Sequence, residues 1–299
     1  MTITQFNRIV EIRTKIISMG TFLCGSLFAV IVTGIWSWPR FIVMAVAVLC
    51  VDMGTTGFNS YFDFISGTDN AQYNLERDKV LVHEGVHPKS ALAISLSLFA
   101  IAGVLGILLA WWTSFTLLLV GGFCMIVGFL YTGGPFPISR TPFGELFAGS
   151  FLGTVLFVLS FYVQTLSYNL TTILVSIPLL LLIALILMVN NSCDRVADKI
   201  AGRRTLSILL PQRTIQIIMR LILILAFGLE LLFTWLQIIP LTVIPFGIAG
   251  GLLAWKSMRT MEKRGFSLET KGPSMNNVSH IFLFYCASFI GGILLFLLL

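Results

Sequence analysis

Nine long apolar segments, separated by shorter polar ones, dominate this chain. Each is a nearly continuous hydrophobic run of the length that a helix needs to cross a bilayer, roughly 17–25 residues. Barrel strands would alternate apolar and polar residues, so these continuous runs predict helices. The predicted spans cover residues 17–36, 41–62, 90–111, 114–132, 144–163, 170–189, 215–236, 239–257 and 278–298.

The composition agrees with an all-α, polytopic membrane protein. Of the 299 residues, 57% are hydrophobic and 11% are charged, whereas a soluble domain carries about 25% charged residues. A large aqueous domain is therefore excluded. We expect one integral-membrane domain over residues 1–299, a single bundle of nine helices around a central cavity.

The basic residues predict the orientation of this bundle. Only Arg40, of the 19 Lys and Arg residues, falls outside the N-terminal segment and the alternate loops that share its side. The positive-inside rule then places the N-terminus in the cytoplasm and the C-terminus outside. The same asymmetry explains the net charge of +6 without a nucleic-acid partner.

Two polar clusters that resemble each other interrupt the apolar pattern. One runs over residues 59–69 and the other over residues 190–198; each begins with Asn-x-x-x-Asp and adds a further Asp. They follow the second and sixth predicted spans, at the cytoplasmic side. This predicts a duplicated four-helix unit, over residues 17–132 and 144–257, with the ninth helix as an addition.

The spacing within the clusters predicts polar helix faces. Residues four apart lie on one face of a helix, so Asn190, Asp194 and Asp198 form a stripe, and Asn59 and Asp63 begin another. Carboxylates at such positions in a membrane protein are costly and usually mark a functional site.

Gly67 is expected to end the first of these helices, so that Asp69 folds back toward the cluster. Four carboxylates in one pocket would repel one another without a divalent cation, and hard oxygen ligands suit Mg²⁺. The alternative is that these charges sit at the membrane border and pair with one another. Two matching clusters at corresponding places argue against that alternative.

Basic residues near both clusters complete the pattern of a diphosphate site, in which the metal bridges carboxylate and phosphate and the cations neutralise the rest. An apolar bundle beside it would hold a long hydrocarbon tail. The candidate diphosphate-binding residues are Asn59, Arg77, Lys79, Arg140, Asn190, Lys199 and Arg203.

The two clusters resemble the aspartate-rich signatures of the UbiA superfamily of intramembrane aromatic prenyltransferases. The matching stretches are Asn-x-Tyr-Phe-Asp-Phe-x-x-Gly-Thr-Asp from Asn59, and Asn-Asn-x-x-Asp-x-x-x-Asp-x-x-Ala-Gly-Arg-Arg-Thr-Leu from Asn190. Within the superfamily, the chain is most similar to 1,4-dihydroxy-2-naphthoate prenyltransferases of menaquinone synthesis. Residues 67–69, 202–206, 131–135 and 144–146 carry that similarity. Ser60 departs from the pattern, since many relatives have Asp there.

The resemblance implies Mg²⁺-dependent transfer of a polyprenyl group from its diphosphate to 1,4-dihydroxy-2-naphthoate, with loss of CO₂ and diphosphate, giving demethylmenaquinone. The predicted topology makes the active site open to the cytoplasmic side, and no obligate protein partner is evident from the sequence. The implied metal ligands are Asn59, Asp63, Asp69, Asn190, Asp194 and Asp198, and the implied catalytic residues are Asp63, Asp69, Asp194, Asp198 and Tyr131.

Other functions remain open at this point. The same chemistry could act on another acceptor, such as a 4-hydroxybenzoate or haem. A cation-coupled transporter is a different class, but transporter sites usually lie near the bilayer midplane on broken helices, whereas these clusters lie at its border.

Three further residues carry weaker expectations. Tyr131 could stabilise an allylic cation through its ring, or be an interfacial tyrosine. Asp52, deeper on the face of Asn59, is an acceptor-side candidate, or else pairs with a buried donor. Glu145 is a second acceptor-side candidate, although a carboxylate at a helix N-terminus is favourable by dipole alone.

Overall fold

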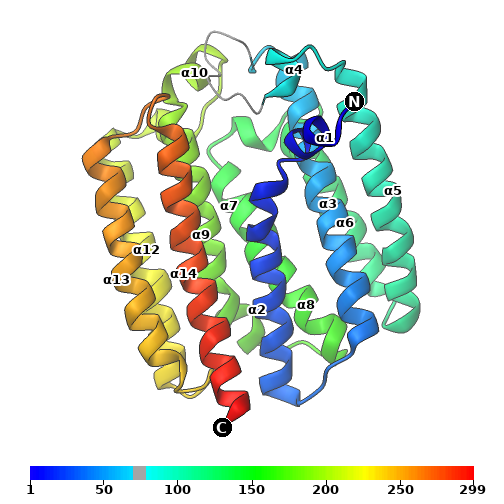
Figure 1. The fold of residues 1–299 in the computed structure, drawn as a ribbon, viewed down its shortest axis with the longest axis vertical. Coiled ribbons are helices and arrows are strands. Elements are labelled where there is room, and N and C mark those ends of the chain that lie inside the picture. Colours follow the sequence, from blue (N-terminus) through cyan, green and yellow to red (C-terminus); the bar gives the residue numbers. More distant parts are fainter. Residues whose placement is uncertain (70–78) are drawn as a thin grey trace.

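Long apolar helices run side by side along one axis in the computed structural model (Figure 1). The structure describes residues 1–69 and 79–299, and no strand occurs among them. The α-helices are α1 Ile3–Ile9, α2 Ile16–Thr33, α3 Trp38–Ile65, α4 Val80–His83, α5 Pro88–Trp112, α6 Thr116–Thr132, α7 Gly144–Ala148, α8 Leu156–Thr165, α9 Leu170–Cys193, α10 Arg195–Ile200, α11 Leu206–Leu209, α12 Gln212–Trp235, α13 Val243–Arg264 and α14 Lys271–Leu298. Three further segments are the 3₁₀-helices η1 (Ile12–Lys15) and η2 (Ile138–Arg140) and the π-helix η3 (Gly149–Val155).

The helices coincide with the spans expected from the apolar pattern. Seven helical stretches of the described chain are long and apolar enough to cross a membrane, which makes this an integral membrane protein. α6 is a shorter apolar helix, and α13 carries charged residues such as Lys256, Arg259 and Lys263 in its second half. The all-helical fold is confirmed, while the count of nine spans and the internal duplication stay predictions.

Both polar clusters lie at the same end of the bundle, which we call the polar end. α4 and α10, which follow the two clusters, lie at the upper end in Figure 1, together with the N-terminus. The C-terminus lies at the opposite end. The clusters can therefore meet across the bundle.

α9 is the most buried of the long apolar helices. It packs against α12, α14 and η3. Gly149 and Gly153 of η3 permit a close approach, because a Cβ atom on either would come within 2.5 Å of the Leu180 backbone. This packing brings the start of α7 against the end of α9, beside the second cluster.

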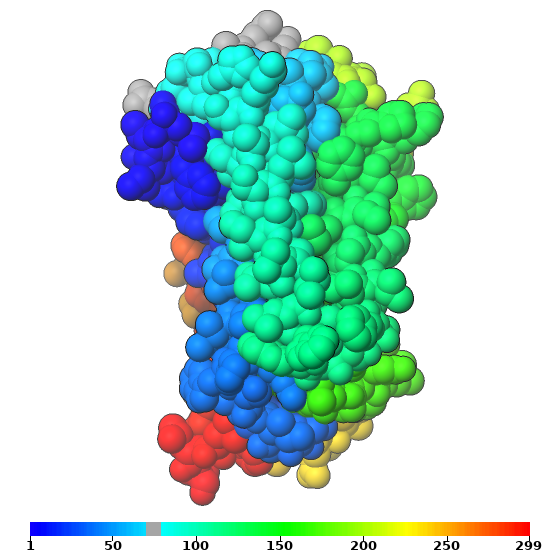
Figure 2. All heavy atoms as spheres, turned by 90° about the vertical axis from the view of Figure 1, so that its right-hand side faces the viewer, coloured from blue at the N-terminus to red at the C-terminus, as the bar shows by residue number. Residues whose placement is uncertain are grey.

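The outer surface of the bundle is apolar, as contact with lipid requires. α5 runs along the face shown in Figure 2, and Ile101, Val104 and Trp111 on it are exposed. Since water would make such a surface costly, this face is suited to the hydrocarbon region of a bilayer.

Candidate functional site

The first cluster folds back on itself at the end of α3, as expected. Gly67 adopts a left-handed conformation with φ of +73°, which a residue without Cβ reaches at little cost. The turn lets the backbone N–H of Asp69 donate to the carbonyl of Asp63 at 2.9 Å. Asp63 and Asp69 thereby line the same cavity as Asn59.

The second cluster spans a helix break, which corrects the expectation of one continuous helical stripe. α9 ends at Cys193 and α10 begins at Arg195, with Asp194 between them. The i to i−4 bonding nevertheless continues, because the N–H of Asp194 donates to Asn190 at 3.0 Å and that of Asp198 donates to Asp194 at 2.8 Å. Asn190, Asp194 and Asp198 therefore all still line the cavity.

Arg203 joins the two clusters. Its Nη2 lies 3.0 Å from Oδ1 of Asp63, and its Nη1 lies 3.2 Å from Oδ1 of Asp198. Gly202, with φ of +73°, turns the chain after α10, and the backbone N–H of Arg203 donates to the carbonyl of Asp198 at 2.9 Å. The guanidinium thus lies between α3 and α10 and pairs with one carboxylate from each helix.

Two lysines pair with the remaining carboxylates. Nζ of Lys79 lies 3.2 Å from Asp69, and Nζ of Lys271 lies 2.8 Å from Asp194. Lys79 was expected here. Lys271 was missed, because it lies in the loop before the ninth predicted span and its spacing relates it to neither cluster.

The site opens into one cavity of about 1740 Å³. Its wall changes from polar near the clusters to apolar farther along α5, α6 and α8, where Ala102, Leu109, Leu117 and Leu156 line it. A cavity with a charged mouth and an apolar interior suits a ligand with an anionic head and a hydrocarbon tail.

Several expected site residues lie at or behind the cavity wall. Tyr131 lines the cavity, and the hydroxyl of neighbouring Thr132 donates to Oδ1 of Asn59 at 2.6 Å. Arg140 does not line it; its Nη2 donates to Thr68 at 3.0 Å, which ties η2 to the first cluster. Lys199 is exposed outside the lining.

Two other residues of the expected pattern have defined places. The hydroxyl of Ser60 donates to the carbonyl of Ile9 at 3.1 Å and lies outside the cavity lining. Ser60, where many relatives have Asp, therefore links α3 to the end of α1, and its side chain is not part of the cavity wall. Arg77 lies outside the described residues.

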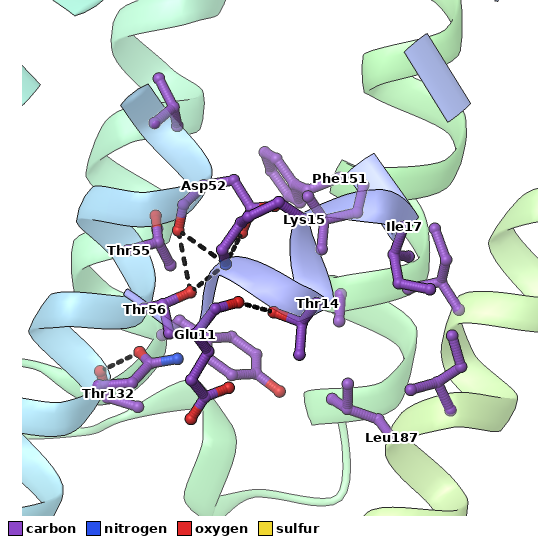
Figure 3. Close-up of a pocket in the computed structure, with 18 of the residues that line it drawn as sticks. Glu11, Thr14, Lys15, Ile17, Asp52, Thr55, Thr56, Thr132, Phe151 and Leu187 are labelled. Carbon is purple, nitrogen blue, oxygen red and sulfur yellow. Dashed lines mark hydrogen bonds and ion pairs between the residues drawn. The ribbon is translucent and has the colours of Figure 1, made fainter. Parts of the chain in front are cut away.

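Asp52 both lines the cavity and pairs with a buried donor. Figure 3 shows Lys15 reaching from η1 to Asp52 and Thr56 on α3, with Nζ 2.7 Å from Oδ1 of Asp52 and 2.6 Å from Oγ1 of Thr56. Ser18 donates to the other carboxylate oxygen of Asp52 at 2.6 Å. This buried polar group lies on the wall of the cavity beside Thr55.

Glu145 is buried rather than exposed to the cavity. Nδ2 of Asn191 donates to its Oε1 at 2.9 Å, and Glu145 is absent from the cavity lining. The bond joins α7 to α9 directly behind Asn190. Its geometry supports a role in holding the second cluster in place.

Comparison with known proteins identifies the family. Residues 18–265 match the UbiA prenyltransferase family. The chain belongs to this family. The 1,4-dihydroxy-2-naphthoate octaprenyltransferase of Bacillus subtilis is 40% identical over 173 residues, which are 58% of this chain and 55% of that relative. The match thus spans little more than half of either protein.

Solved UbiA structures share the whole fold. A homologue from Aeropyrum pernix aligns with a TM-score of 0.70 at 16% identity, over 96% of this chain and 98% of that one. An Archaeoglobus fulgidus homologue, solved with DMAPP and Mg²⁺, aligns with a TM-score of 0.66 at 13% identity, over 97% and 99% of the chains. At such identities, these likenesses establish the UbiA fold.

The Asn and Asp oxygens of this UbiA-family site suit a Mg²⁺ ion that a phosphate group of the ligand also binds. Within the described ranges, no three His, Cys, Asp or Glu side chains gather into a ready metal site. Mg²⁺ often takes only one or two carboxylates and completes its shell with water and substrate phosphates, so separated Asp residues suit it. Oδ2 of Asp198 is buried and has no hydrogen-bond partner among the described residues. Burial raises the pKa of Asp198 to about 6, against the opposing effect of Arg203, and a bound cation would favour the ionised form.

Proposed function

We propose that this UbiA-family protein transfers a polyprenyl group from its diphosphate to 1,4-dihydroxy-2-naphthoate, with loss of CO₂ and diphosphate, giving demethylmenaquinone. The observation that carries the proposal is the meeting of both Asp clusters, joined by Arg203, at the mouth of an apolar cavity. The name of the Bacillus relative supports the choice of acceptor.

The polar end would hold the diphosphate. Mg²⁺, when bound by Asn59, Asp63, Asp69, Asn190, Asp194 and Asp198, would supply Lewis-acid stabilisation of the leaving diphosphate. Arg203, Lys79 and Lys271 lie beside these carboxylates and offer donors to phosphate oxygens. Arg140 is proposed to act through Thr68, and Lys199 is proposed to attract the anion from outside the cavity. Arg77 is proposed as a further diphosphate-binding residue from the sequence alone.

The chain's own residues would then orient and protect the reacting groups. The C–O bond of the prenyl diphosphate breaks and its electron pair leaves with the diphosphate. The ring forms the new C–C bond to the prenyl carbon, and its carboxylate leaves as CO₂ while the bonding pair stays with the ring. Apolar walls would exclude the water that otherwise hydrolyses the cation. Tyr131 lines the cavity, and its ring would stabilise the developing charge.

Orientation in the membrane is part of the proposal. The N-terminus and the polar end face the cytoplasm, where a soluble aromatic acid and a diphosphate are both available. A reporter enzyme that is active only outside the cytoplasm, fused to the C-terminus, is expected to be active. Activity from the same reporter fused to the N-terminus would instead indicate the opposite orientation.

The decisive test is product analysis with purified protein in lipid. Mass spectrometry should detect prenylated quinol when Mg²⁺, prenyl diphosphate and dihydroxynaphthoate are present, with a panel of 4-hydroxybenzoate, haem and other phenols as competing acceptors. Asp63→Ala and Asp194→Ala should abolish turnover, whereas Glu269→Ala, an exposed carboxylate outside the cavity, should not. Preference for another acceptor would change the assigned substrate, and full activity in either Asp variant would overturn the site.

A further inference from the structure

Each carboxylate of the site is already neutralised by a basic side chain. Lys79 pairs with Asp69 and Lys271 pairs with Asp194. Arg203 pairs with both Asp63 and Asp198. A divalent cation that enters this site therefore meets positive charge at every carboxylate. How the protein admits it depends on whether these basic groups can move.

Arg203 and Lys271 differ in how firmly they are held. The side chain of Arg203 is 10% exposed and its guanidinium contacts two carboxylates, while its backbone N–H donates to the carbonyl of Asp198. Lys271 is the first residue of α14, which packs against α9, and its ammonium reaches Asp194 at the end of α9 on a flexible four-carbon stem. Its backbone is thus anchored by a long helix while its charged end can change partner.

Metal and ammonium compete for the same carboxylate. Nζ of Lys271 lies 2.8 Å from Oδ2 of Asp194, and a Mg²⁺ ion would have to approach that carboxylate to about 2.0–2.1 Å. Two cations so close repel each other unless an anion lies between them. The oxygens of a diphosphate supply that anion, because they accept hydrogen bonds from an ammonium group while binding the metal.

We propose that Lys271 exchanges partners during substrate binding: it neutralises Asp194 in the absence of metal and turns to the diphosphate when metal and diphosphate bind together. This inference rests on the proposed function, since it needs a diphosphate ligand at this end of the cavity. Lys271 then opposes binding of metal alone and favours binding of the metal with the diphosphate. The two ligands become thermodynamically coupled through one side chain.

The test measures metal and diphosphate binding separately, without turnover. Full-length protein in nanodiscs is titrated with Mn²⁺ alone, followed by the electron paramagnetic resonance signal of the unbound ion. A radiolabelled thiolo analogue of geranyl diphosphate is then titrated at saturating Mg²⁺. Lys271→Met removes the charge and keeps much of the stem, Lys271→Arg keeps the charge, and Lys263→Met is a control at an exposed lysine of α13 outside the cavity.

Lys271→Met is expected to bind Mn²⁺ more tightly and the diphosphate analogue more weakly, each by roughly five- to tenfold, at the lower end of typical site–site coupling. Lys271→Arg and Lys263→Met should resemble the wild type. Weaker binding of both ligands would show a merely structural lysine and overturn the proposal, as would unchanged binding of either. Failure of the wild type to bind the analogue at all would instead contradict the proposed function.

Discussion

Arg203 and Asp63 are 140 positions apart in the chain, yet Nη2 of Arg203 donates to Oδ1 of Asp63 at 3.0 Å. The same guanidinium lies 3.2 Å from Asp198. One largely buried cation therefore connects the end of α3 to α10. The two halves of the site are aligned by the chain's own residues.

Loss of this connection should weaken the use of the donor substrate. Arg203→Met removes the charge-assisted hydrogen bond to Asp63, worth about 1.5–3 kcal/mol, so kcat/KM for the prenyl diphosphate should fall by roughly 10- to 100-fold. Arg203→Lys keeps the charge without the fork that spans two carboxylates, and should be intermediate. Steady-state kinetics check this, with Arg213→Met, an exposed arginine at the start of α12, as the control. An Arg203→Met enzyme with the kcat/KM of the wild type would show that the link is dispensable.

Metal and diphosphate should stabilise the fold together. A ligand that binds only the folded state adds about 2.7 kcal/mol at a hundred times its Kd, so Mg²⁺ plus inorganic diphosphate should raise the Tm above that of chelator-treated protein. Asp194→Asn should lose most of this increase, because the amide gives the ion no negative charge. Glu269→Gln, on the exposed surface, should keep it. The measurement is thermal unfolding in detergent, and an equal Tm increase in Asp194→Asn would argue against Asp194 as a ligand.

Local sequence signals predicted much of this site. The apolar runs located the helices, and the matched clusters located both ends of the site because each cluster sits within a few residues of a helix end. Gly67 predicted the turn that returns Asp69 toward Asp63, and the structure has that turn. Such features depend on contacts only a few residues apart.

Partners from distant elements were not predictable in this way. In the sequence, Lys15 and Lys271 were only two of the basic residues in the N-terminal segment and the loops that predict the orientation. In the structure, each forms an ion pair with an aspartate from another element, Lys15 with Asp52 of α3 and Lys271 with Asp194 at the end of α9. The helix break at Asp194 and the burial of Glu145 behind the cavity likewise depend on how α7, α9 and α10 pack. No spacing rule encodes those packings.

The ion pair between Lys15 and Asp52 should behave as one unit. Removing one partner of a buried pair leaves an uncompensated charge and costs about 3–5 kcal/mol, whereas replacing both with apolar residues is often close to neutral. Lys15→Met and Asp52→Leu should each lower the Tm, and the double variant should recover most of the loss. A decrease in Tm in the double variant equal to the sum of the decreases in the two single variants would contradict a coupled pair. Kinetics on the double variant then test the acceptor side: a raised KM for the acceptor, with an unchanged KM for the donor, is expected if Asp52 contacts the ring.

The apolar part of the cavity should set the length of the donor tail. Gly122 of α6 lines the cavity, and a Cβ at this position would have no atom within 4 Å, so Gly122→Phe fills space in the cavity without a clash at its own Cβ. Each CH₂ group excluded from an apolar site loses about 0.8 kcal/mol of binding free energy. Loss of room for one isoprene unit should therefore lower kcat/KM for long donors at least about tenfold. The kcat/KM for dimethylallyl diphosphate should stay unchanged. Gly228→Phe on α12 is the matched control, because its Cβ also meets open space but it lies outside the cavity lining. Mass spectrometry across donors of graded length reads out the profile, and identical profiles for the two variants would place the tail elsewhere in the bundle.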